Sequence, residues 1–154
     1  RACISLGLFC TFFAVPIGIG TGFIRPTVEW RPFWQLPFIL LGIFFFTGIP
    51  EEFIFRGILY NLLAKTIHGK HRQWIALAIS SVIFGLAHLN NHKPPYIEVH
   101  LFGFQYPVPW VYLVLATIAG WFYGLAYIRT GSILAAVLLH TMVDGWWVYF
   151  FGGK

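Results

Sequence analysis

Five stretches of this sequence have about the length that crosses a lipid bilayer and carry almost no charge. They cover residues 3–23, 33–50, 74–89, 108–128 and 132–151, and their only acidic, basic or imidazole side chains are His88, His140 and Asp144. The hydrocarbon core of a bilayer is about 30 Å thick, and about 20 apolar residues in a helix cross it. The sequence therefore predicts an all-α, polytopic transmembrane bundle with about five spans.

The second stretch continues beyond two adjacent acids, Glu51 and Glu52, because apolar side chains keep recurring to about Ala64. Both acids are therefore predicted to lie at membrane depth. Gly48 to Pro50 precedes them, and proline suits the first turn of a restarted helix, so we expect a broken helix there. Within a bilayer, freed backbone groups need surrounding protein or a water-filled cavity. We therefore expect the acids to face a polar intramembrane cavity, formed by the second, third and fifth spans.

The composition indicates which partners to expect. Hydrophobic residues make up 58% of the chain and charged residues 10%, against about 25% charged in an average soluble domain. The net charge of +5 comes without an aromatic and basic platform, so nucleic acid is not an expected partner. Basic loops such as Lys65 to Arg72 suit a membrane surface instead. We expect a plasma or energy-transducing membrane, with a helix and interfacial loop over 1–35 and one domain over 36–154.

Glu51, Glu52 and Arg56 need an explanation, since an ionisable side chain at the bilayer centre costs roughly 2.5–3.5 kcal/mol. Glu52 and Arg56 are four residues apart and share a helix face, which permits a salt bridge. Glu51 points about 100° away. A structural ion pair that fixes helix packing would explain Glu52 and Arg56 alone. The second acid leaves a negative charge that needs a proton, a histidine or a metal.

Two further helices carry ionisable groups at the same spacing. Phe84 and His88 are four residues apart on the third span, and His140 and Asp144 are four apart on the fifth. A lone histidine on an apolar helix is more often packed than catalytic, but packing would have to explain three helices at once. Two carboxylates and two imidazoles together supply a general base, a proton carrier and hydrogen-bond donors for an oxyanion.

These motifs, in this order, resemble those of the CPBP family of CAAX proteases and bacteriocin-processing enzymes, also called Abi. The resemblance covers residues 36–150. Its residues are Glu51-Glu52-x-x-x-Arg56, Phe84-x-x-x-His88 and His140-x-x-x-Asp144, with Gly124 to Ile133 leading into the last motif.

The resemblance implies a glutamate-dependent intramembrane endopeptidase. Glu51 and His88 would activate water. Arg56 would hold the acidic pair in place, with Glu52 as a supporting acid, while His140 and the residue four positions beyond it would stabilise the tetrahedral oxyanion.

Asp144 departs from the prenyl-protease pattern, in which an asparagine at this position can donate a hydrogen bond. An ionised aspartate only accepts hydrogen bonds. Either Asp144 is protonated in its buried site, or it orients His140 so that the imidazole alone donates.

Other functions compete with this interpretation. No cofactor is predicted; a divalent metal such as zinc is the alternative, although the sequence lacks a His-Glu-x-x-His motif. A non-catalytic scaffold, immunity protein or assembly subunit would use the polar cluster for packing. A transporter or proton relay would also place acids and histidines in the membrane, but no repeat of broken helices supports one. The expected partners are the bilayer, a peptide or membrane-protein substrate, and other membrane subunits.

Overall fold

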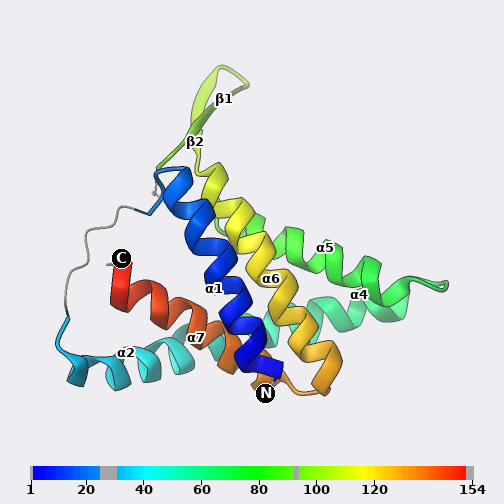
Figure 1. Ribbon diagram of the computed structural model, residues 1–154. Coiled ribbons are helices and arrows are strands. Elements are labelled where there is room, and N and C mark those ends of the chain that lie inside the picture. The colour runs from blue at the N-terminus through cyan, green and yellow to red at the C-terminus, as the bar shows by residue number, and fades with distance from the viewer. Residues whose placement is uncertain (1, 25–30, 92–93, 152–154) are drawn as a thin grey trace.

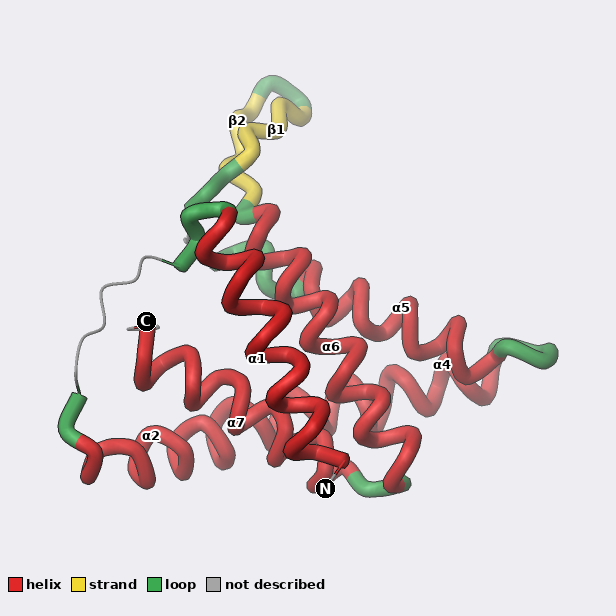
Figure 2. Tube along the Cα trace, viewed as in Figure 1, coloured by secondary structure: helices red, strands yellow, loops and turns green. Residues whose placement is uncertain are grey.

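A computed structural model describes residues 2–24, 31–91 and 94–151, and it is helical except for one hairpin (Figures 1 and 2). Each of the five predicted stretches contains helix, so the helical membrane bundle is confirmed. The long elements are α1 (Ala2–Gly20), α2 (Leu36–Ile43) with its continuation to Thr66, α5 (Arg72–Leu86), α6 (Trp110–Thr130) and α7 (Ile133–Phe151).

The second stretch forms one helical segment of 34 residues, Phe33–Thr66, so the predicted continuation past the acids is confirmed. It begins with the 3-10 turn η1 (Phe33–Gln35). After α2 it alternates between π-helical and α-helical stretches: η2 (Phe44–Gly48), α3 (Ile49–Glu52), η3 (Phe53–Tyr60) and α4 (Asn61–Thr66).

The predicted break at Gly48 to Pro50 takes another form. Gly48 and Ile49 keep right-handed helical backbone angles, and the Ile49 N–H donates to the Phe44 carbonyl five residues earlier. The chain therefore meets Pro50, which has no N–H to donate, by widening its turn rather than by ending the helix. Such π-helical stretches are rare and often occur at functional sites. Both acids lie on α3, between the two π-helical stretches.

Three helices in the described part of the chain are long and apolar enough to cross a membrane: Phe33–Thr66, α6 and α7. The uncharged α1 has 19 residues and α5 has 15. Phenylalanines such as Phe12 and Phe46 lie exposed on the outer surface, as expected where lipid is the solvent. The count of five crossings stays a prediction, and positions 25–30 of the predicted interfacial loop lie outside the described residues.

Small residues let α5 and α6 approach closely, as helices in membranes often do. Gly85 of α5 faces Thr117 and the Leu113 carbonyl of α6. Gly120 and Gly124 of α6 face the side chains of Phe84 and Leu77 in turn. The contact is thus tight from both sides, and it fixes the position of the α5 end that carries His88.

The connection between α5 and α6 contains an antiparallel hairpin that was not predicted from the sequence. It consists of β1 (Ile97–Leu101) and β2 (Phe104–Val108). The hairpin projects from the end of the bundle where α5 ends and α6 begins (Figure 1).

We expect Gly85→Ala to destabilise the bundle by about 1–3 kcal/mol, the usual effect of overpacking. A Cβ at this position would lie 2.8 Å from the Leu113 carbonyl oxygen, which belongs to the backbone and cannot rotate away. The matched control is Gly42→Ala in α2, where a Cβ meets nothing within 4 Å. Reversible unfolding in mixed micelles should show a loss for Gly85→Ala only; equal stability of the two variants would contradict the tight α5–α6 contact.

Candidate active site

A buried ion pair lies at the centre of the bundle. The Arg56 Nη1 donates to Glu52 Oε1 at 3.0 Å, and Nη2 donates to the backbone carbonyl of Gly120 on α6. Glu52 is 0% and Arg56 1% exposed. The pairing expected from the four-residue spacing is therefore present, and it ties the second helical segment to α6.

Aromatic rings surround the guanidinium group. The Arg56 Cζ lies 4.8 Å from the centroid of the Phe84 ring and 5.5 Å from that of Tyr123. A cation near an aromatic face is attracted by the ring quadrupole, more strongly where water is excluded. The rings therefore stabilise the positive charge from α5 and α6, while Glu52 neutralises it from the same helix.

His140 of α7 connects this ion pair to a second carboxylate. Its Nδ1 lies 2.9 Å from Glu52 Oε1, and its Nε2 lies 3.2 Å from Asp144 Oδ2. The imidazole stacks on the Tyr123 ring with centroids 4.6 Å apart and 14° between the planes. Because ionised carboxylates only accept hydrogen bonds, a ring with a hydrogen on each nitrogen satisfies both contacts.

Glu51 has a different environment from its neighbour. Its side chain is 31% exposed, against 0% for Glu52, and its Oε2 lies 3.9 Å from His140 Nε2. Among the described residues that buried oxygen has no hydrogen-bond partner. Glu51 also lies within electrostatic range of His88 and Asp144. Glu52 also has an unpaired Oε2 among the described residues, so the two acids differ in exposure: Glu52 is enclosed with the ion pair, and Glu51 is partly exposed.

His88 lies in the turn that follows α5, not on the helix itself, so its predicted placement on the third span needs correction. The helix ends at Leu86, and the His88 N–H donates to the Gly85 carbonyl in a tighter, three-residue step. The His88 Nδ1 donates to the Phe84 carbonyl at 2.8 Å. A neutral ring with its hydrogen on Nδ1 has its lone pair on Nε2, which is therefore free to accept a proton.

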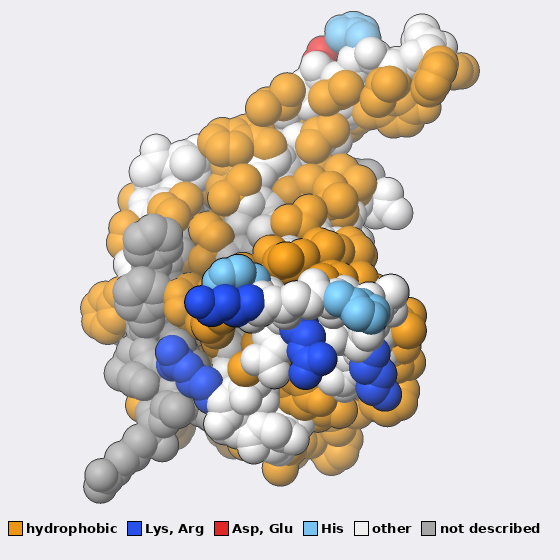
Figure 3. Space-filling view, turned by 90° about the vertical axis from the view of Figure 1, so that its right-hand side faces the viewer, with side chains coloured by type: hydrophobic (Ala, Val, Ile, Leu, Met, Phe, Trp, Pro, Cys, Tyr) orange, Lys and Arg blue, Asp and Glu red, His pale blue; other side chains and the backbone are white. Residues whose placement is uncertain are grey.

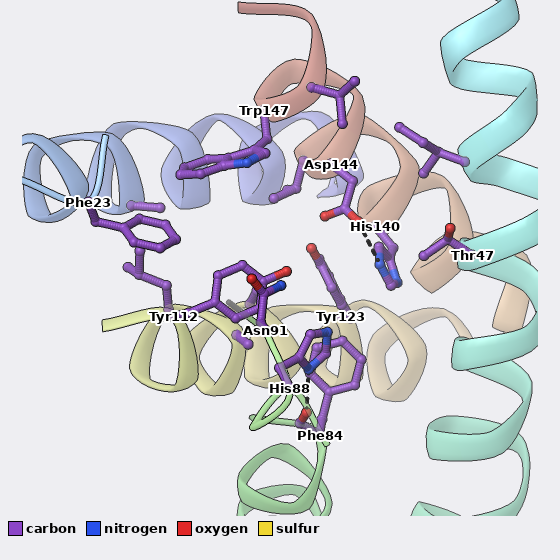
Figure 4. Close-up of a pocket in the computed structure, with 17 residues that line it drawn as sticks. Phe23, Thr47, Phe84, His88, Asn91, Tyr112, Tyr123, His140, Asp144 and Trp147 are labelled. Atoms are coloured by element: carbon purple, nitrogen blue, oxygen red, sulfur yellow. Dashed lines mark hydrogen bonds and ion pairs between the residues drawn. The ribbon is translucent and has the colours of Figure 1, made fainter. Parts of the chain in front are cut away.

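The two histidines line one cavity of about 350 Å³. Figure 4 shows His88 and His140 on opposite sides of Tyr123, with Asp144 next to His140. Lining residues also come from α1 and α6, so the predicted three-span cavity involves more of the bundle than expected. The wall is mostly apolar, with its polar groups at intervals.

The acids do not line this cavity directly. Glu51 and Glu52 are absent from the described residues of its wall, as is Arg56. Glu52 points into the core, where Arg56 and His140 both bond to it. Glu51 does not line the cavity itself, but it lies next to His140, which does. Ion pairs therefore link five of the predicted residues: Glu51, Glu52, Arg56, His140 and Asp144. The sixth, His88, lines the same cavity as His140.

Sequence reasoning gave no chemical role to several residues of the site. Tyr123 stacks on His140, and Gly120 supplies a backbone carbonyl to Arg56. Asn91 and Tyr112 lie side by side at the cavity wall near His88 (Figure 4). The sequence signal for Asn91 and Tyr112 was an amide and a polar ring close to the ends of apolar stretches. Tyrosines at the membrane interface give the same pattern, so this signal did not mark them as site residues.

A metal site was the alternative to water activation by side chains. Among residues 2–24, 31–91 and 94–151, no group of three or more His, Cys, Asp or Glu side chains is arranged to hold a metal ion. Cleavage measured with and without a chelator distinguishes a metal-dependent from a metal-independent reaction.

A helical bundle in which carboxylates and imidazoles converge beside an apolar cavity defines an integral membrane protein with an acid and imidazole site. Residues 32–146 match the family model described as type II CAAX prenyl endopeptidase Rce1-like. The chain belongs to this family, in agreement with the resemblance to CAAX proteases, and the family indicates a CAAX-protease type of function. No curated protein and no solved structure matches the chain significantly.

We expect Arg56→Met to destabilise the protein by about 3–5 kcal/mol, because removing the guanidinium breaks a buried ion pair and leaves the Glu52 carboxylate with His140 as its remaining partner. The exposed Arg72→Met should change stability by less than about 0.5 kcal/mol. Unfolding in mixed micelles measures both, and the double variant Glu52→Leu/Arg56→Met should recover part of the loss. If Arg56→Met loses no more stability than Arg72→Met, the buried ion pair is not needed for the stability of the fold.

Proposed function

We propose that this protein hydrolyses a peptide bond at the membrane with water activated by Glu51 and His88. The observation that carries the proposal is the convergence of two acids and two histidines, from three separate segments, next to one cavity. Packing alone would require only the Glu52 and Arg56 pair. The proposed substrate is a peptide or membrane-protein segment that enters from the bilayer.

Glu51 and His88 take the roles of base and water orienter. A water molecule between them would donate one hydrogen to the partly exposed Glu51 carboxylate and another to His88 Nε2. Transfer of a proton to either acceptor lets the water oxygen attack the scissile carbonyl carbon, and the same group then gives the proton to the departing amine. Both acceptors have lone pairs for this task.

His140 is the proposed donor to the oxyanion. Its Nε2 faces Asp144 and lies 3.9 Å from Glu51 Oε2, so a hydrogen on Nε2 can be shared with an oxygen bound beside Asp144. Glu52 holds the opposite nitrogen at 2.9 Å and keeps the imidazole in place. In this arrangement Asp144 orients the ring, and the asparagine of the prenyl-protease pattern is not required.

A non-catalytic scaffold is the second candidate, and one observation favours it. Both nitrogens of His140 already meet carboxylates, which is what a purely structural network needs. In that case the protein would act as an assembly or immunity subunit that binds other membrane proteins.

We expect Glu51→Gln and His88→Phe each to reduce peptide cleavage in liposomes by 10²-fold or more, the usual contribution of general acid and base groups. Glu51→Gln keeps the side-chain volume nearly constant, and His88→Phe keeps an aromatic ring, although a larger one. The controls are Glu98→Gln and His68→Phe, which alter exposed residues outside the site and should leave the rate unchanged.

Folding of each variant is checked by its unfolding midpoint in micelles. Cleavage that resists chelators and disappears in both site variants supports the proposal. Loss of cleavage on chelation, with recovery on adding zinc, would replace it by the metal alternative. If no peptide from a broad membrane panel is cut while Glu51→Gln still captures the same membrane partners, the scaffold function is correct.

A further inference from the structure

The hairpin over 97–108 has one apolar and one polar face. In its register Ile97 pairs with Val108, Val99 with Tyr106 and Leu101 with Phe104, all on one face. The opposite face carries Glu98, His100 and Gln105, and the Gln105 amide donates to Glu98 Oε2 at 3.2 Å. This alternation is typical of a sheet that has water on one side only.

The apolar face is not covered by the described part of the chain. Leu101 is 49%, Phe104 65% and Tyr106 49% exposed, and neither strand packs extensively against a described helix. An isolated two-stranded hairpin is only marginally stable in water. Figure 3 shows the apolar surface running from the helices onto the hairpin, with the polar side chains at its outer edge. The uncovered face is thus continuous with the lipid-facing surface of the bundle.

The turn at the tip is unfavourable in water for two reasons. Phe102 has a φ of 52° and Gly103 a φ of 81°, the two positive values that a tight hairpin turn needs and that Asn-Gly usually supplies. A bulky residue at positive φ is strained. The Phe102 ring is also 95% exposed, so neither the strain nor the exposure is offset by contacts within the described chain.

The position of the hairpin in the fold indicates what can cover its apolar face. The candidate span α6 begins at Trp110, directly after β2, and the cavity-lining residues Asn91 and Tyr112 flank the segment that contains the hairpin. The hairpin therefore leaves the bundle at the edge of a span, beside the cavity. Between residues 94 and 109 the sequence has no Lys or Arg and only Glu98 as an acid, so the hairpin itself carries no cation to attract acidic headgroups.

We propose that the apolar face of this hairpin, with Phe102 at its tip, lies in the interfacial region of the phospholipid bilayer. The bilayer covers the face that the protein leaves open and takes up the Phe102 ring, while Glu98 and His100 remain in water. The hairpin thereby holds the cavity end formed by Asn91 and Tyr112 at the membrane surface. This inference concerns membrane docking and does not depend on catalysis.

The test uses single spin labels in the full chain, in phosphatidylcholine liposomes. Cys3 and Cys10 are first replaced by serine, and the label is placed by Leu101→Cys on the apolar face or by His100→Cys on the polar face. The two positions are adjacent, so they differ in face and hardly in position along the hairpin. We expect oxygen, which concentrates in lipid, to relax the label at 101 more than a water-soluble nickel complex does, and the opposite order at 100.

The variant Phe102→Asn isolates the contribution of the ring. Asparagine suits positive φ, so the turn persists while the aromatic group is lost, and the oxygen-to-nickel ratio at 101 should fall. Adding anionic lipid or salt should leave the ratio unchanged. Equal nickel access at 100 and 101 would place the hairpin in water and overturn the proposal. Spin–spin broadening at 101 that disappears on dilution with unlabelled protein would overturn it in favour of a second copy of the chain.

Discussion

The guanidinium of Arg56 lies inside a bundle whose described buried side chains are mostly apolar. Its two Nη nitrogens meet one carboxylate on its own helix and one backbone carbonyl on α6, whereas Nε has no hydrogen-bond partner among the described residues. Aromatic rings lie over the group. The carbonyl is accessible because Gly120 has no side chain; a Cβ there would lie 3.3 Å from Arg56 Nη2. Burying this one charge thus determines how the second helical segment, α5 and α6 fit together.

The same charge explains why two adjacent acids acquire different properties. Consecutive helical residues point about 100° apart, so only one of the pair can face Arg56. Glu52 takes that position and also binds His140, which brings α7 into the network. Glu51 is left at the edge of the cluster, partly exposed, with its Oε2 3.9 Å from the Nε2 of the same imidazole. Helix geometry alone therefore gives two identical side chains different roles: Glu52 is a structural carboxylate in the ion pair, and Glu51 is available for other contacts.

Much of this arrangement could be predicted from the sequence, because uncharged stretches and four-residue spacings are local properties. The Glu52 and Arg56 pair and the His140 and Asp144 pair are both observed at their expected spacing. His88 was placed on a helix because nothing in the sequence fixes where α5 ends. The stacking of Tyr123 on His140, like the carbonyl of Gly120, depends on how α6 packs against its neighbours, and spacing within one segment does not contain that information. The hairpin was missed because its alternation is short and broken by proline and glycine.

The position of the Glu52 and Arg56 pair within a single helix also bears on how the protein is made. His140 follows Glu52 by 88 residues, so the second segment is synthesised and delivered to the membrane long before α7 exists. During that interval the two opposite charges can already neutralise each other across one helical turn. The charges of Glu52 and Arg56 are therefore compensated before α7 arrives, and α7 adds a hydrogen bond to an acid that is already paired. Glu51, in contrast, gains its imidazole neighbour only when α7 is in place.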